Sequence, residues 1–180
     1  PGLKVAVVGA SGYVGGELLR LLAAHPGVAE LRAMSASRAG EPWSAVHPSL
    51  ANLAGGGHRF EAVEPREAGR WADVVVLALP HGHSQKVLEA VESGGPGLVI
   101  DTAADFRLAD RARAESVYGP HARPDALGSF ACGLADVEGA ALAGRRRIAV
   151  PGCFATAALL ALWAIAGVLD VKAEGAQLDV

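Results

Sequence analysis

Short apolar runs alternate with amphipathic segments along the chain. Five short runs, at 4–8, 29–34, 74–79, 98–101 and 148–150, are mostly aliphatic or β-branched, although the second also contains Glu30 and Arg32. Runs of this length and composition are typical of strands buried on both faces of a parallel sheet. Helical spacing follows the first run at 17–25 and the third at 85–91, and a segment rich in Ala and Leu follows Cys153. This alternation predicts an α/β fold, a Rossmann-type doubly wound parallel sheet with right-handed crossovers.

Two stretches lack this periodicity. Residues 39–70 contain Pro42, Pro48, Pro65 and three consecutive glycines, and 111–131 is equally irregular. We expect 39–70 to be loop-rich and without chemistry, with His47 and His58 on the surface, and 111–131 to be irregular.

A glycine-rich turn connects the first strand to the first helix. Glycines stand at 9, 12 and 15, a G-x-x-G-x-x-G pattern. Glycine allows a sharp turn and a close approach to a pyrophosphate, which would rest on the helix N-terminus. The strand before the turn and the helix after it favour nucleotide binding over a purely structural tight turn.

The residues after the second strand suggest which dinucleotide binds. In such folds an acidic side chain here binds the ribose hydroxyls of NAD, whereas arginine accommodates the 2′-phosphate of NADP. This chain has Ser35, Ser37 and Arg38, and no carboxylate before Glu41. We therefore predict NADP, the alternative being an ordinary exposed arginine in a loop.

Polar side chains also follow the third and fourth strands. His81, His83 and Ser84 come after the third strand, where ligands of open α/β sheets bind. Two histidines at i and i+2 do not make a metal site without a third ligand. After the fourth strand, Asp105 and Arg107 are either a structural salt bridge or, for Arg107, a contact to an anionic substrate.

Cys153 stands at a strand-to-helix turn, directly after Pro151-Gly152. The free N–H groups and the positive end of the helix dipole favour a thiolate at such a position. A thiolate placed in this way can attack an acyl carbon. The alternative is a small buried hydrophobic residue, the commoner role of a free cysteine.

Composition and charge argue against a nucleic-acid-binding protein and against a membrane-spanning protein. The 180 residues are 51% hydrophobic and 5% aromatic with a net charge of −3, so nucleic acid is not an expected partner. The only basic block, 145–147, is expected to be a solvated loop. No run approaches the roughly 18 apolar residues of a membrane span. No signal-peptide pattern is present, and Cys132 and Cys153 lack metal-ligand spacing, so we expect a cytoplasmic protein without disulfides.

Four motifs together carry a resemblance to a known family. They are Gly-Ala-Ser-Gly-Tyr-Val-Gly-Gly-Glu at 9–17, Ala-Leu-Pro-His-Gly-His-Ser at 78–84, Ala-Asp-Phe-Arg-Leu at 104–108 and Val-Pro-Gly-Cys-Phe-Ala-Thr-Ala at 150–157. In this order and spacing they resemble the N-acetyl-gamma-glutamyl-phosphate reductases, relatives of aspartate-semialdehyde dehydrogenase. The resemblance extends from Lys4 to about Val180.

The resemblance implies an NADPH-dependent reduction of an N-acylated glutamyl phosphate to the semialdehyde, a step of arginine biosynthesis. Cys153 would displace phosphate to form a thioester, which is then reduced. Arg107 would bind the substrate. The implied cofactor-binding residues are Gly9, Ser11, Gly12, Tyr13, Val14, Gly15, Ser35, Ser37, Arg38, Leu79, Pro80 and His81, and no metal is implied.

The chain departs from the pattern of this family at three points. The family usually has Tyr-Gly-Leu-Pro-Glu at 132–136 and often Tyr-Pro at 154–155, where this chain has Cys-Gly-Leu-Ala-Asp and Phe-Ala. Family members also run to about 350 residues, with a second α+β domain that supplies a general-base histidine and most of the dimer interface. No histidine follows Cys153. We expect residues 1–150 to be the dinucleotide-binding domain. We expect 151–180 to be the nucleophile helix and the start of a truncated α+β domain for catalysis and dimerisation. The full-length protein is expected to be a homo-oligomer.

Other functions stay open. One is the equivalent reduction of an aminoadipyl phosphate in lysine biosynthesis. A second is a dehydrogenase of the aspartate-semialdehyde or glyceraldehyde-phosphate type. The sequence around Cys153 argues against this alternative. A third is a non-catalytic NADP-binding module.

Overall fold

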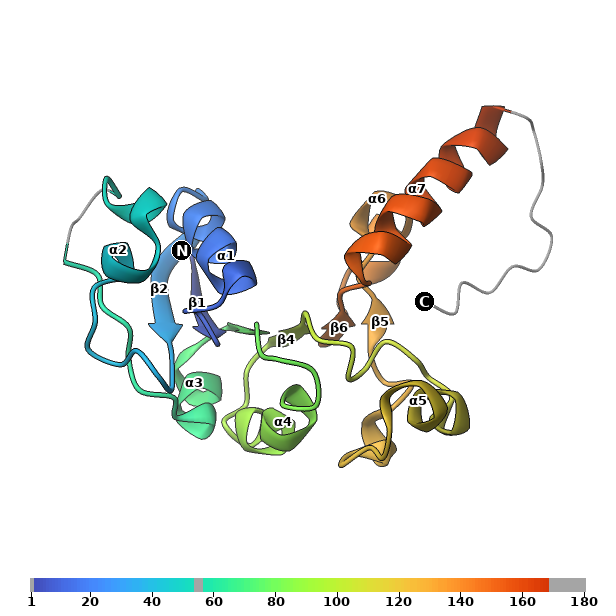
Figure 1. Ribbon diagram of the computed structural model, residues 1–180, viewed down its shortest axis with the longest axis horizontal. Helices are drawn as coiled ribbons and strands as arrows, with labels where there is room; N and C mark the ends of the chain where they lie inside the picture. Colours follow the sequence, from blue (N-terminus) through green and yellow to red (C-terminus); the bar gives the residue numbers. More distant parts are fainter. Residues whose placement is uncertain (1, 54–56, 169–180) are drawn as a thin grey trace.

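A computed structural model describes residues 2–53 and 57–168, and they form a six-stranded parallel sheet with helices on both faces (Figure 1). The strand order is β2-β1-β3-β4-β6-β5, and every neighbouring pair is parallel. The strands are β1 (Leu3–Val8), β2 (Val28–Met34), β3 (Val74–Leu77), β4 (Leu98–Asp101), β5 (Ala131–Cys132) and β6 (Arg147–Ala149). The predicted doubly wound α/β class is confirmed.

The helices lie in two layers. Helices α3 (Pro65–Trp71), α4 (Ser84–Ser93) and α5 (Arg111–Tyr118) cover one face, and α1 (Tyr13–Ala23), α6 (Ala135–Glu138) and α7 (Cys153–Val168) lie on the other (Figure 1). The short helix α2 (Trp43–Val46) packs beside α1. Three 3₁₀ turns complete the described elements, η1 (Pro48–Leu50), η2 (Pro124–Ala126) and η3 (Gly139–Leu142).

The alternation of side chains along the strands builds a core on each face. Ala6 and Val8 of β1 belong to one cluster, which includes Val75, Leu88 and Phe106, while Val5 and Val7 belong to the other. Successive side chains of a strand point to opposite faces, so one apolar strand supplies both cores. This explains why residues 5–8 of β1 form a continuous apolar run rather than an alternating one.

Helix α1 begins earlier than the sequence predicted, at Tyr13 rather than Glu17. Gly12 is its N-cap residue, and the helix buries Gly15, Gly16 and Leu19 against the sheet. A Cβ built on Gly15 would lie 2.5 Å from the Cα of Ala10, so only glycine permits this close packing.

The predictions that 39–70 is loop-rich and that 111–131 is irregular were wrong in part. Helix α3 has Pro65 in its first turn, a preferred position for proline, and Gly69 lets it approach the backbone of α4. Helix α5 buries only Ala114, so no apolar stripe marks it, but Asp110 caps it by accepting a hydrogen bond from the Arg113 N–H at 2.7 Å. The two-residue strand β5 was also missed.

Residues 151–180 were expected to open a second domain. The structure describes this segment as far as 168, as helix α7, and the strand expected at 175–180 lies outside the described residues. Among the helices of the described ranges, none combines the length and the apolar character that a bilayer crossing requires.

Candidate active site

The carboxyl ends of β1, β3, β4 and β6 all open toward one edge of the sheet. The chain reverses its direction of strand addition between β1 and β3, since β2 is added on one side and β3 on the other. Ligands of open α/β sheets bind at such a switch point. The turns that follow these four strands contain most of the residues singled out from the sequence.

The glycine turn packs directly against the end of β3. The N–H groups of Gly9 and Ala10 both donate to the carbonyl of Met34, each at 2.9 Å. Gly9 has a φ of +88°, and a Cβ built on it would lie 2.3 Å from the carbonyl oxygen of Ala78. The turn therefore requires glycine for its backbone conformation and for the space beside Ala78.

The start of α1 is open to a ligand. Tyr13 is 99% exposed and Val14 52% exposed, and the N-cap Gly12 makes no side-chain cap. The N–H groups of a first helical turn have no intrahelical partner, and they carry the positive end of the helix dipole. The residues present thus fit a pyrophosphate, with a glycine cradle on one side and unpaired N–H groups on the other.

The predicted phosphate-binding residues after β2 have different environments. Ser35 is buried; its hydroxyl pairs with that of Ser11 at 2.7 Å and accepts from the Arg38 N–H at 3.2 Å. Ser37 and Arg38 are exposed, and Arg38 forms a salt bridge with Glu41 at 3.3 Å. Ser35 therefore shapes the loop and links it to the glycine turn, whereas the side chains of Ser37 and Arg38 are exposed where a ligand can reach them.

Leu79, Pro80 and His81 begin the loop that joins β3 to α4. The Leu79 side chain lies beside Gly9, with its Cδ2 3.1 Å from the position of a Gly9 Cβ. Nδ1 of His81 accepts a hydrogen bond from the N–H of Ala104 at 2.8 Å. Leu79 thus adjoins the glycine turn, while His81 connects its loop to the one after β4.

Asp105 and Arg107 do not form the salt bridge considered from the sequence. The buried Asp105 carboxylate accepts from the N–H groups of Gly82, at 2.7 Å, and Gln85, at 3.0 Å, and so caps the start of α4. Nε and Nη2 of Arg107 donate instead to the carbonyls of Val150, at 2.8 Å, and Thr102, at 2.9 Å. Arg107 therefore ties the end of β4 to the end of β6, immediately before Cys153.

Cys153 is exposed at the first position of α7. The Thr156 N–H donates to the carbonyl of Gly152 at 2.8 Å, so Gly152 is the N-cap residue that precedes the helix. A Cβ on Gly152 would lie 3.1 Å from Nη1 of Arg107, which places the guanidinium against this turn. The thiol thus sits at the positive end of a helix, in the turn that a cation braces, and the alternative of a buried structural cysteine is wrong.

A groove of about 860 Å³ runs over the sheet between α1 and α7. Thr102, Arg107, Cys153 and Thr156 line one part of it, and Val14 at the start of α1 also lines it. The nucleophile candidate and the N-terminus of α1 therefore face the same space. Sequence reasoning missed Thr102 and Thr156; Thr102 could have been found from its place directly after β4.

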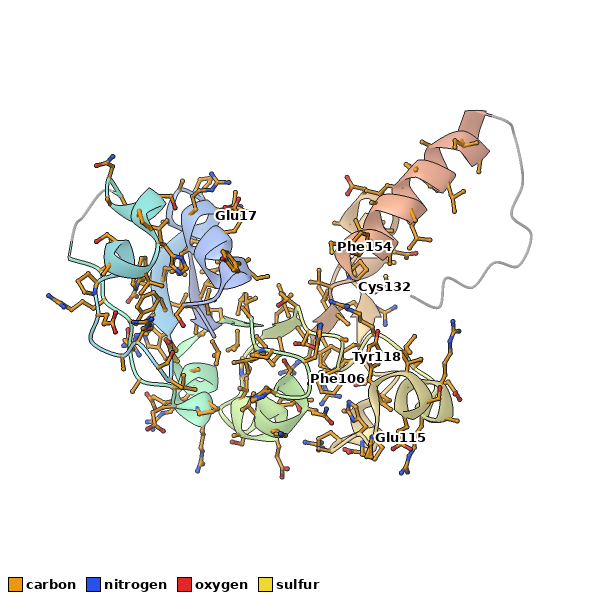
Figure 2. The ribbon with its side chains drawn as sticks, in the orientation of Figure 1. Glu17, Phe106, Glu115, Tyr118, Cys132 and Phe154 are labelled. Atoms are coloured by element: carbon orange, nitrogen blue, oxygen red, sulfur yellow. The ribbon has the colours of Figure 1, made fainter. Side chains whose placement is uncertain are left out.

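The other cysteine, Cys132, lies on β5, opposite Ala149 of β6. Figure 2 shows Cys132 and Phe154 at the same end of the sheet, where α7 starts. Both thiols are free. Over residues 2–53 and 57–168, the structure brings together no group of three or more His, Cys, Asp or Glu side chains suited to a metal ion.

Asp101 ends β4 beneath this site and is fully buried. Its Oδ1 accepts from the Ala103 N–H at 3.1 Å, but Oδ2 and the nearby Ser84 hydroxyl have no hydrogen bond of normal geometry. Burial raises the pKa of Asp101 to about 6, outweighing the Ser84 hydroxyl and the Ala103 amide, which both favour the charged form.

We predict that Asp101→Asn stabilises the fold at neutral pH. Because the pKa of Asp101 is raised on folding, its favourable contribution is complete below the ordinary value of 3.8 and is lost as the pH rises through about 6. The neutral amide keeps the bond to Ala103 and avoids this loss. Urea denaturation should show a gain of roughly 3 kcal/mol at pH 7.5 and almost none at pH 4. An equal effect at both pH values would show that desolvation of the charge is not the cause.

The amino-acid sequence of this chain is similar to that of known proteins. Residues 4–145 match the family model described as semialdehyde dehydrogenase, NAD binding domain. The chain is 48% identical over 170 residues to an N-acetyl-gamma-glutamyl-phosphate reductase of Mycobacterium avium, which covers 89% of this chain and 46% of the relative. It is 42% identical over 161 residues to a putative [LysW]-L-2-aminoadipate/[LysW]-L-glutamate phosphate reductase of Pyrococcus furiosus, again covering 89% and 46%. The chain thus spans about half the length of these curated relatives.

Solved structures give the same fold. Aspartate semialdehyde dehydrogenase II of Vibrio cholerae, complexed with ASA, superposes with a TM-score of 0.66 at 22% identity, covering 93% of this chain and 47% of that one. The aspartate semialdehyde dehydrogenase of Candida albicans, with NADP, gives 0.57 at 17% identity over the same 93% and 47%. The resemblance expected from the four motifs is confirmed by the sequence relatives, and the fold by these structures.

Proposed function

Because the chain belongs to the family of semialdehyde dehydrogenase NAD-binding domains, we propose that it holds the cofactor and the nucleophile of a reductase acting on an N-acylated glutamyl phosphate. The product would be the semialdehyde and inorganic phosphate. The observation that carries this proposal is the exposed Cys153 thiol at the N-terminus of α7, in a groove that also reaches the N-terminus of α1.

The first half of the reaction uses Cys153 alone as the attacking group. Its thiolate adds to the carbonyl carbon of the acyl phosphate, the C–O bond to phosphate breaks, and a thioester on Sγ remains. A reduced nicotinamide, when bound, supplies a hydride to the thioester carbon. The resulting tetrahedral oxyanion on Cys153 then collapses as the C–S bond breaks, which releases the aldehyde and restores the thiolate.

Arg107 serves this chemistry in two ways in the proposal. Its Nε and Nη2 bonds to the carbonyls of Val150 and Thr102 hold the turn that carries Cys153. Its Nη1 lies next to Gly152, on the wall of the groove, and is the group we propose for contact with the anionic substrate. A guanidinium already fixed by two hydrogen bonds loses little further freedom when it binds an anion.

The nicotinamide cofactor would lie across the switch point between β1 and β3. The turn 9–15 would hold its pyrophosphate, and Leu79, Pro80 and His81 would border it at the end of β3. We propose NADP as the preferred form, supported by the exposed Ser37 and Arg38 after β2.

Arg38→Ala is expected to raise the Kd for NADPH about tenfold and to leave the Kd for NADH unchanged. The arginine fork is lost, but no contact to the ribose itself is removed. Isothermal titration calorimetry with both cofactors measures the difference. Arg20→Ala is the matched control, because Arg20 is also exposed and also paired with a glutamate three residues away, Glu17. Equal weakening of NADPH and NADH binding would argue against a 2′-phosphate site.

The acyl-phosphate reaction can be tested on this chain directly. The protein is mixed with N-acetyl-gamma-glutamyl phosphate without cofactor, and intact-mass spectrometry reports whether one N-acetylglutamyl group is added. We expect the adduct on Cys153, release of one equivalent of phosphate, and loss of the adduct when NADPH is added. The aminoadipyl homologue run in parallel decides the chain length of the substrate. Tight NADPH binding with neither adduct would point to the non-catalytic binding module instead.

Three further expectations stand as proposals of the same kind. They are a domain boundary at 150/151, a homo-oligomeric full-length protein, and a cytoplasmic location, which the two free thiols support. Light scattering of the full-length protein would report the oligomeric state.

A further inference from the structure

His47 was expected to lie on the surface, but it is half-buried against the glycine turn. It follows the short helix α2, and its Nε2 lies 3.0 Å from the carbonyl oxygen of Ala10. A carbonyl can only accept, so Nε2 carries the hydrogen of this bond. The ring makes a T-shaped contact with Phe60, with 6.0 Å between ring centroids, and Phe60 is buried in the core of the α1 face.

The ring also determines which residue can stand at 16. A Cβ built on Gly16 would lie 2.6 Å from both Cε1 and Nδ1 of His47, so the imidazole lies against the backbone of α1. The ring therefore contacts the turn at Ala10 and the helix at Gly16.

The bond to Ala10 settles the direction of one peptide group in the turn. The carbonyl of Ala10 accepts from His47, which fixes the peptide group that this carbonyl shares with the N–H of Ser11, while the Ala10 N–H holds the preceding peptide group by donating to Met34. A carbonyl oxygen turned toward a phosphate would repel it, whereas the N–H groups at the start of α1 attract it. With the Ala10 carbonyl engaged by His47, the anion-facing side of the turn is left to N–H groups.

We propose that His47 is a positioning residue for dinucleotide binding, holding the Ala10 carbonyl so that the glycine turn presents its N–H groups to the pyrophosphate. This inference rests on the proposed dinucleotide site at that turn. His47 acts through Ala10 and does not itself contact the ligand.

The test compares two substitutions that differ in one property. His47→Phe keeps a ring against Gly16 and Phe60 but loses the donor, while His47→Gln keeps a donor. We expect His47→Phe to raise the Kd for NADPH about tenfold with an unchanged melting temperature, and His47→Gln to recover most of the affinity. His58→Phe is the matched control, because His58 lies in the same segment and stacks on Trp43 with 4.6 Å between ring centroids. It should bind NADPH like the unmodified protein.

A second pair of variants tests the same contact from the side of helix α1, so that the conclusion does not depend on His47→Phe alone. Gly16→Ala should displace the ring and weaken NADPH binding to the same degree, and it should have no further effect when His47→Ala is also present. Hydrogen exchange of the ligand-free protein should show faster exchange over 9–16 in His47→Phe and in Gly16→Ala.

The outcomes separate this inference from the proposed function. NADPH affinity unchanged in His47→Phe overturns the positioning role, as does a parallel loss of affinity and melting temperature. If the unmodified protein binds neither NADPH nor NADH, the proposed dinucleotide site is wrong, and hydrogen exchange over 9–16 still decides whether His47 orders the turn.

Discussion

Cys153→Ser is expected to slow acylation by N-acetyl-gamma-glutamyl phosphate at least about 10³-fold, because a serine hydroxyl is hardly ionised at neutral pH and no adjacent base activates it in the described structure. NADPH binding should be unchanged, since the glycine turn lies on a different element. The rate of phosphate release and the mass of the acylated protein measure the first effect, and calorimetry measures the second.

Cys132→Ser is the matched control for this experiment. Cys132 is partly buried on β5 and Cys153 is exposed on α7, so the two variants make the same chemical change in different settings. We expect Cys132→Ser to acylate at nearly the normal rate. Loss of acylation in Cys132→Ser with full activity in Cys153→Ser would show that Cys132 is the nucleophile, and it would overturn the mechanism.

Gly9→Ala is expected to lower the free energy of unfolding by about 3 kcal/mol or more and to abolish dinucleotide binding. The added methyl would meet the Ala78 carbonyl at 2.3 Å, and Ala78 is itself bonded to β1 through Val8. Neither partner is a flexible side chain, so β1 and β3 would have to separate at their carboxyl ends.

Gly40→Ala isolates the conformational part of this effect. Gly40 has nearly the same φ, +83° against +88°, but a Cβ on it would meet nothing within 4 Å. We expect a loss of only about 1 kcal/mol there. Urea denaturation followed by tryptophan fluorescence compares the two. A loss at Gly40 as large as that at Gly9 would show that backbone strain, and not the clash with β3, dominates.

The strands and the switch-point loops could be predicted because their signals are local. A strand buried on both faces is an apolar run in the sequence, and the residues that follow it come to the ligand edge of the sheet wherever the strand lies. The position of Cys153 at the start of a helix could be predicted in the same way, because a Pro-Gly turn between a strand and a helix fixes its surroundings within a few residues.

The contacts of Asp105, Arg107 and His47 could not be predicted because their partners are distant in sequence. Asp105 caps α4 at Gly82 and Gln85, and Arg107 bonds to the carbonyl of Val150, 43 residues away. No periodicity links such positions. Helix α5 was missed for the opposite reason, since it is mostly exposed and its sequence has no apolar stripe to recognise.

The two edge strands of the described sheet, β5 and β2, determine how readily a strand of another chain could pair with it. An open sheet edge is a template for adding a foreign strand and so for aggregation. At one edge β5 has only two residues, too few to pair with an added strand over any length. At the other edge, β2 carries Glu30 and Arg32, which form salt bridges with Lys4 at 3.2 Å and Glu61 at 3.6 Å. The end of β2 is covered as well, because Met34 pairs with Glu61 in a parallel bridge. Within the described residues, the short β5 and the charged, partly covered β2 are therefore both poor templates for adding a further strand.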